Sequence, residues 1–141
     1  NADYTKNAVI NQTTNATTGN FLSGVNGSNS HAFYFSGTTS PNLWHSGNFA
    51  PGPSIPLNTL AQATGVFTVT NSTGLVYVNG IAGSAGTNVN SFNDASIQLG
   101  AYSGGYNFTG YISEAFIFNT ALSNSNRQAL ELNQQQYYTL P

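Results

Sequence analysis

Short runs of alternating apolar and polar residues, separated by glycine- and asparagine-rich stretches, recur along this chain of 141 residues. A period of two is typical of β-strands with one buried face. We predict strands at residues 3–10, 20–25, 31–36, 42–46, 65–70, 75–79, 95–100 and 108–119. The segment 50–56 contains Pro51, Pro53 and Pro56. Because proline has no backbone donor, this segment is not expected to be a central strand.

Two hairpins follow from the turn residues. The first joins the strands around residues 69 and 77 through residues 71–74, after which the dipeptide Asn79-Gly80 turns the chain again, since both residue types tolerate positive φ. The second joins residues 31–36 to 41–46. If residues 37–40 are its loop, Phe33 lies opposite Trp44, and Tyr34 lies opposite Leu43.

The period changes near the C-terminus. Ser123 is a favourable N-cap, and residues 124–138 carry Ala129, Leu130 and Tyr137 at helical spacing. Many short strands followed by one late helix indicate an all-β fold. We predict a single domain over residues 1–141, an antiparallel β-sandwich of jelly-roll type with a short C-terminal helix.

Charge is scarce, at 4% of residues, with only two basic side chains, Lys6 and Arg127. Two cations cannot neutralise a run of phosphates or attract an anionic bilayer, which argues against nucleic-acid and membrane-surface binding. No apolar run reaches the length that spans a bilayer, so membrane insertion is not expected. The absence of cysteine excludes disulfides and thiolate metal sites, and a chain free of oxidisable sulfur fits a secreted, extracellular location.

Three motifs point to a known family. Residues 75–80 read LVYVNG, and residues 108–123 read FTGYISEAFIFNTALS. The first resembles the LYVNG hairpin of laminin-G-like, concanavalin A-like domains. The second resembles their closing pattern, in which F-x-G-x-I-x-E-x-x-I leads into N-x-A-L-S and a short helix. Residues 133–138, NQQQYY, are similar to the end of versions found in large surface proteins of Bacteroidota-type bacteria.

The chain departs from this family at its beginning. Members open with a strand that carries an FDG-x-D motif, and no such motif is present here. The resemblance therefore implies a sandwich that lacks its first strand, or one whose edge is completed by another chain. An open edge of this kind invites strand addition and self-association.

The family includes both glycosidases and lectins, so function must come from the residues. Glycosidases use two carboxylates held a few ångströms apart. The four acids of this chain are Asp3, Asp94, Glu114 and Glu131, and no two are close in sequence. Glu114 shares strand parity with Phe116, so we expect an inward-pointing, structural acid. The chain is not predicted to be an enzyme.

Aromatic side chains are the candidate ligand contacts. Tyr102 and Tyr106 lie in a glycine-rich loop between strands, where lectin sites often lie, and Trp44 offers a stacking platform with Asn42 and His45 beside it. A second interpretation of Trp44 is a core residue packed on Phe33. In the expected register the two histidines, His31 and His45, lie on opposite faces, which argues against a shared metal or a proton relay.

The resemblance also implies calcium as a candidate cofactor. Asn90, Asn93 and Asp94 would supply oxygen ligands, although one carboxylate makes a weak site.

Two functions follow from the sequence. The first is a non-catalytic module that binds glycans or cell-surface polysaccharide, or mediates adhesion, through a neutral surface of Tyr, Trp and Asn. The second is a structural subunit of a filament, an adhesin stalk or a virion surface, assembled by strand addition between neighbours.

Overall fold

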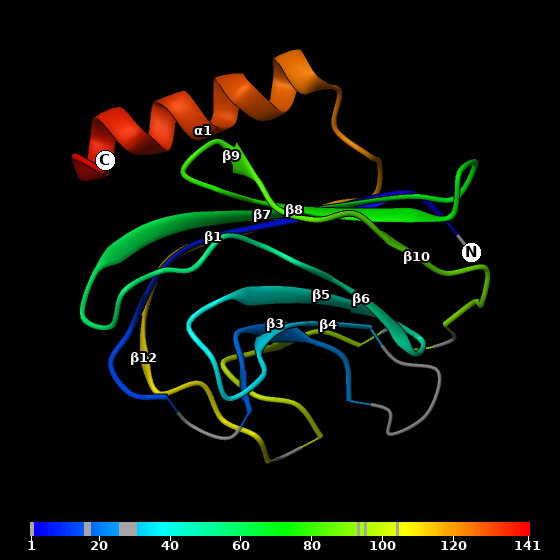
Figure 1. Cartoon of the computed structure of the whole chain (residues 1–141), viewed down its shortest axis with the longest axis horizontal. Helices are drawn as coiled ribbons and strands as arrows, with labels where there is room; N and C mark the ends of the chain where they lie inside the picture. The colour runs from blue at the N-terminus through cyan, green and yellow to red at the C-terminus, as the bar shows by residue number, and fades with distance from the viewer. Residues whose placement is uncertain (1, 16–17, 26–30, 93, 95, 104) are drawn as a thin grey trace.

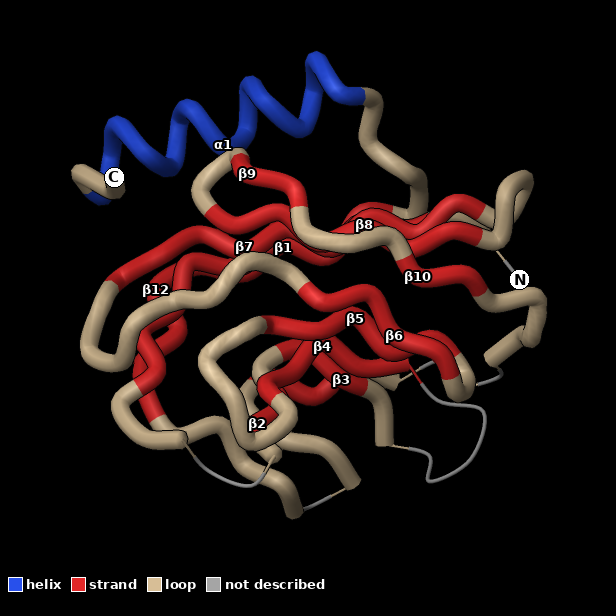
Figure 2. The backbone as a smooth tube through the Cα atoms, in the orientation of Figure 1, coloured by secondary structure: helices blue, strands red, loops and turns tan. Residues whose placement is uncertain are grey.

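The computed structural model describes residues 2–15, 18–25, 31–92, 94, 96–103 and 105–141. Two antiparallel sheets face one another, and a helix covers the outer face of one of them (Figure 1). Figure 2 shows the helix and the second sheet on opposite sides of the first sheet. The fold is therefore the predicted all-β sandwich with a single C-terminal helix among the described residues.

The first sheet has six strands in the order β10-β8-β7-β1-β12, with β9 paired to β8. Their bounds are β1 Tyr4–Gln12, β7 Leu60–Thr68, β8 Thr73–Val78, β9 Ile81–Ala82, β10 Gly86–Thr87 and β12 Gly110–Phe118. β1 lies between β7 and β12 and is antiparallel to both. The expectation that a strand is missing before β1 stays a prediction.

The second sheet has four strands in the order β2-β4-β5-β6. Their bounds are β2 Gly19–Asn20, β4 His31–Phe35, β5 Pro41–His45 and β6 Asn48–Pro51. The short strands β3 Leu22–Ser23 and β11 Gln98–Leu99 pair with each other and extend this layer, because Phe21 and Gly24 donate backbone hydrogen bonds to β4. The proline-rich segment contributes only the edge strand β6, as its missing donors require.

The core fills the space between the sheets. Ala8, Ile10 and Phe67 from the first sheet pack in one cluster with Phe33 and Leu43 from the second. Each comes from alternate positions of its strand, which is the pattern that predicted these strands. All eight predicted strand segments overlap observed strands, and α1, Asn124–Tyr138, begins after the predicted N-cap Ser123, whose hydroxyl accepts from the Asn126 N–H.

The predicted register of the second hairpin is wrong by one residue. Phe35 pairs with Pro41, so the loop has five residues, 36–40, and Trp44 lies opposite Ala32 instead of Phe33. A slip of one residue moves a side chain to the other face of a sheet. Trp44 is therefore on the outward face, and the expectation that it packs on Phe33 in the core is wrong.

The same slip changes the relation of the two histidines. His31 and His45 are cross-strand partners on the inner face of the sheet, instead of lying on opposite faces as expected. Each is buried. Among the residues described, no group of three or more His, Cys, Asp or Glu side chains that could hold a metal ion is found.

Backbone conformation explains why glycine stands in both the Asn79-Gly80 turn and the closing motif. Asn79 and Gly80 have φ of 46° and 81° and connect β8 to β9, as the sequence predicts. Gly110, the glycine of the closing motif, has φ of 156°, and a Cβ there would lie 2.0 Å from the carbonyl oxygen of Asn11. Only glycine lets β12 approach β1 this closely.

Glu114 does not point into the core as expected. The register of β1 against β12 shifts between Val9 and Ile10, so Glu114 lies opposite Val9 on the face beneath α1. There it accepts a hydrogen bond of 2.8 Å from the Gln134 amide, which also bonds to Asn7. Its role is structural, because it helps fasten the helix to the sheet.

A polar layer thus lies between α1 and the first sheet. Arg127 and Glu131, one turn apart on the helix, form a buried ion pair, and the Arg127 guanidinium stacks on the Tyr77 ring at 3.6 Å. No helix in the described part of the chain is long and apolar enough to cross a membrane.

Candidate ligand-binding site

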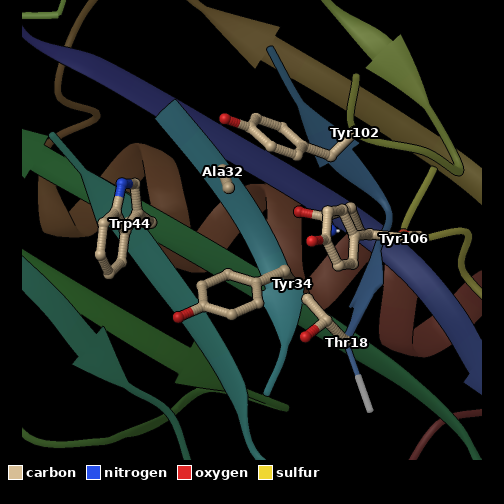
Figure 3. A pocket seen from close by; sticks show the side chains of 7 residues that line it. Thr18, Ala32, Tyr34, Trp44, Tyr102 and Tyr106 are labelled. Carbon is tan, nitrogen blue, oxygen red and sulfur yellow. Dashed lines mark hydrogen bonds between the residues drawn. The ribbon is translucent and has the colours of Figure 1, made fainter. Parts of the chain in front are cut away.

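A pocket of about 330 Å³ opens on the outward face of the second sheet, away from α1. Its walls carry four aromatic rings (Figure 3). The lining residues are Thr18, Asn20, Ala32, Tyr34, Trp44, Tyr102 and Tyr106. This volume lies at the lower end of the range of roughly 300–1,000 Å³ typical of small-molecule sites.

Two adjacent strands supply one half of the pocket. Ala32 and Tyr34 are two residues apart on β4 and share a face, and Trp44 projects from β5 directly opposite Ala32. The small methyl group of Ala32 lies between the rings of Trp44, Tyr34 and Tyr102 in Figure 3. Alanine at this position leaves a depression with aromatic sides.

A loop supplies the other half. Tyr102 and Gly105 exchange two backbone hydrogen bonds, of 3.0 and 2.9 Å, which close a tight turn. Tyr106 follows with φ of 50° and is 61% exposed, and the centroid of its ring lies 6.2 Å from that of Tyr102.

Asn20 holds this loop on the sheet. The Tyr106 carbonyl accepts from the backbone N–H of Asn20 at 3.0 Å and from its side-chain amide at 3.3 Å. The side-chain oxygen of Asn20, Oδ1, in turn accepts from the Ser23 hydroxyl at 2.8 Å. The loop is therefore tied to the strand beside it, which preorganises both tyrosines.

The pocket is electrically neutral. Its polar groups are phenol and threonine hydroxyls, an indole N–H and one amide. Burial raises the pKa of the Tyr34 hydroxyl, an effect that a hydrogen bond with Ser36 opposes. Tyr34 consequently remains protonated and able to donate at neutral pH.

The structure brings together three of the five predicted ligand contacts, Trp44, Tyr102 and Tyr106. Asn42 and His45 do not line the pocket, although Asn42 shares a face with Trp44 and pairs with Tyr34. Asn42 is buried, and its amide donates to the Ser40 carbonyl at 2.8 Å. His45 lies on the inner face, where its ring stacks on Phe67 at 3.7 Å.

Sequence reasoning missed the other four lining residues, Thr18, Asn20, Ala32 and Tyr34. The correct hairpin register would have revealed Ala32 and Tyr34, because both share a face with Trp44. No sequence signal places Thr18 and Asn20 next to a loop more than eighty residues later.

A second cavity, of about 180 Å³, lies between the sheets and contains buried charge. Lys6 is 2% exposed, and its ammonium donates to the Leu22 carbonyl at 3.0 Å and to His31 Nδ1 at 2.5 Å. Burial lowers the pKa of Lys6 to about 7, although Asp94 raises it. Burial and the nearby Lys6 lower the pKa of His31 to about 4, so this imidazole is neutral.

His45 is also held neutral. The Tyr4 hydroxyl donates to its Nδ1 at 3.2 Å, and its Nε2 then donates to the Asn90 carbonyl at 3.1 Å. Burial lowers the pKa of His45 and raises that of Tyr4. Both histidines are thus hydrogen-bonded components of the core.

The predicted calcium ligands are spread over several interactions. Asp94 is buried and accepts from the Ser96 N–H at 3.0 Å, and it faces Lys6 across the second cavity. The Asn90 amide donates to the Ser46 carbonyl at 3.1 Å. Asn93 lies outside the described residues. Calcium binding stays a prediction.

The sequence model of the concanavalin A-like lectin/glucanases superfamily matches residues 1–126 of this chain. The chain belongs to this superfamily. The match covers most of the sandwich and includes two of the three motifs that carry the resemblance, residues 75–80 and 108–123. A comparison with curated proteins found no match.

Several solved structures share the fold. The CBM40 module of the Ruminococcus gnavus IT-sialidase, bound to α2,3-sialyllactose, superposes with a TM-score of 0.73 at 14% identity, over 92% of this chain and 83% of that one. Domain 4 of AbnA, an extracellular arabinanase of Geobacillus stearothermophilus, was solved in complex with arabinotriose. It has a TM-score of 0.69 at 23% identity, over 93% of this chain and 66% of that one. A heptameric pentraxin of Limulus polyphemus has a TM-score of 0.64 at 19% identity, over 87% and 66%.

Proposed function

We propose that this domain is a non-catalytic, extracellular carbohydrate-binding module that holds a glycan in the aromatic pocket. The observation that carries the proposal is the arrangement of Trp44, Tyr34, Tyr102 and Tyr106 around Ala32. Sugar rings present flat, weakly apolar C–H faces that pack on aromatic rings, while their hydroxyl edges need hydrogen-bond partners. The pocket offers both kinds of group.

The positions of the acids support a non-catalytic role. None of the chain's four carboxylates lines the pocket. Asp3 accepts from the Val69 N–H, Glu114 accepts from Gln134, and Glu131 pairs with Arg127. Hydrolysis by the usual route needs two carboxylates flanking the glycosidic bond.

The structural relatives support glycan binding at the level of the fold. Two of them were solved with a bound oligosaccharide, and one of these belongs to an extracellular enzyme. The absence of cysteine and the scarcity of charge are compatible with a location outside the cell.

A glycan array followed by calorimetric titration tests the proposal. The wild-type protein should bind a defined group of glycans, and Trp44→Ala or Tyr102→Ala should weaken binding at least about fivefold, because stacking of a nucleic-acid base on an aromatic side chain contributes roughly 1–3 kcal/mol. Tyr137→Ala, which removes a 79%-exposed tyrosine from α1, is the matched control and should bind normally. A clean array, or variants that bind like the wild type, would refute a glycan-binding role for this pocket.

A second candidate function is a self-assembling structural subunit. β12 is an edge strand in the described part of the sheet, and it exposes Tyr111, Phe116 and Ile117. An apolar edge of nine residues can pair with the same strand of a second copy. Sedimentation velocity at increasing protein concentration tests this function. Tyr111→Lys should abolish any dimer formed by this edge. A wild-type protein that stays monomeric at all concentrations would contradict assembly.

A further inference from the structure

We infer that the aromatic pocket selects uncharged glycans and discriminates against sialylated, uronic-acid and sulfated ones, because every cationic side chain of the chain is buried away from it. The inference rests on the proposed glycan-binding function and specifies its ligand class. The chain has only two basic residues and two histidines, and the structure describes all four.

Arg127 is on the far side of the molecule. It lies on α1, which covers the outer face of the six-stranded sheet (Figures 1 and 2). The pocket opens on the outer face of the other sheet. Arg127 is 4% exposed, and its guanidinium is paired with Glu131 and stacked on Tyr77. It is therefore unable to contact a ligand in the pocket.

Lys6 and the two histidines lie between the sheets. Lys6 projects from β1 into the core, where Leu22 and His31 accept its hydrogen bonds. His31 flanks Ala32 in sequence, yet strand alternation directs it to the opposite face. His45 is adjacent to Trp44 and is directed inward for the same reason. Both imidazoles have a lowered pKa and carry no positive charge at neutral pH.

An acidic sugar placed on this surface would lose part of the hydration of its carboxylate or sulfate and gain no ion pair. The hydroxyls, the indole N–H and the amide of the lining residues are neutral donors, and hydrogen bonds from neutral donors do not replace hydration of an anion as well as an arginine does. The net charge of −2 adds a weak repulsion. A neutral hexose or pentose requires no such compensation.

The experiment compares matched neutral and acidic ligands by calorimetric titration at low and high salt. Suitable pairs are lactose against sialyllactose and neutral arabinan or galactan against polygalacturonate. The neutral member of at least one pair should bind about tenfold more tightly or better, and its affinity should change less than about twofold between roughly 20 and 500 mM NaCl.

A charge placed at the rim tests the cause. Thr18→Arg should improve binding of the acidic member at least about fivefold and make it salt-sensitive, while Thr18→Gln, its neutral counterpart, should leave the preference unchanged. Wild-type protein that binds the acidic member as well as the neutral one would overturn the inference and leave the glycan-binding function intact. Absence of binding to both members of every pair would overturn the function itself, and the inference with it.

Discussion

Ala32 and Trp44 are cross-strand partners on the outward face of β4 and β5, and the difference in size between them forms the pocket. The Trp44 indole forms one side of the pocket, and the small methyl group of Ala32 leaves the space next to the indole open (Figure 3). A larger residue at position 32 would occupy the volume assigned to the ligand without disturbing the core on the other face.

Filling that space should abolish binding. We expect Ala32→Phe to lower glycan affinity at least about tenfold while changing the melting temperature by no more than about 2 °C, because the new ring packs on Trp44 as aromatic cross-strand pairs do. Calorimetric titration and thermal unfolding measure the two effects. Ala82→Phe, an exposed position on β9, is the control. Full affinity in Ala32→Phe would show that the ligand sits elsewhere.

Loosening the loop should weaken binding without removing any ring. Asn20→Ala deletes the side-chain hydrogen bond to the Tyr106 carbonyl, and we expect a roughly three- to tenfold loss of affinity from the cost of ordering the loop. Proton–deuterium exchange should increase in residues 101–107 of the variant. Thr38→Ala, whose hydroxyl bonds only within its own loop among the described contacts, should change neither quantity.

Stability should rise with pH between about 7 and 9, because of Lys6. Folding lowers the pKa of Lys6 to about 7, so over this window the unfolded chain holds a proton that the folded protein has released. The free energy of unfolding should increase by about 2 kcal/mol, as measured by urea denaturation. Below this window the two histidines also make stability rise with pH, because folding lowers the pKa of His31 to about 4 and lowers that of His45. The charge of Asp94 partly opposes the lowering of the pKa at Lys6 and at His31.

Lys6→Met isolates that contribution. The variant should show a flat profile between about pH 7 and 9, since methionine does not titrate and Tyr4, with its raised pKa, acts only near and above the pKa of an ordinary tyrosine. An unchanged slope in Lys6→Met would mean that another group titrates in this range.

The closing glycine should be intolerant of a side chain. Gly110→Ala places a Cβ against the Asn11 carbonyl, and we expect a loss of about 2–3 kcal/mol in the free energy of unfolding. Gly74→Ala, whose Cβ would meet its neighbours at 3.5 Å or more, should cost less than about 1 kcal/mol. Equal effects of the two substitutions would contradict the steric explanation.

Chelation should leave binding unchanged. Asp94 and Asn90, two of the candidate calcium ligands, already hydrogen-bond to Ser96 and Ser46 and do not line the aromatic pocket. We therefore expect EDTA to alter glycan affinity by less than about twofold. A larger loss that calcium restores would establish a functional metal site.

The strands, the helix and the family were predictable from periodicity, a helix cap and three motifs, because each is a local pattern that extends over several residues. The side of the sheet on which Trp44 lies could not be predicted. It depends on whether the serine- and threonine-rich loop before β5 has four or five residues, and such a stretch has no unique turn signal. Glu114 was misplaced for a related reason: a bulge in β12 reverses the alternation, and nothing in the local sequence marks it.

The loop tyrosines were found because glycine marks a loop tip, but their meeting with Trp44 depends on tertiary structure. Asn20 and Tyr106 contact each other across eighty-six positions of the chain. Contacts over such a separation leave no trace in a single sequence, so Asn20 and Thr18 entered the site only with the structure.

The burial of Lys6 and Arg127 has a consequence for proteolysis. Trypsin cleaves after lysine and arginine, and this chain offers it only these two positions, one in a central strand and one in a helix. Both side chains are almost fully buried. The native protein therefore resists trypsin until the segment around Lys6 or Arg127 unfolds. The rate of digestion then reports on the unfolding of these two segments.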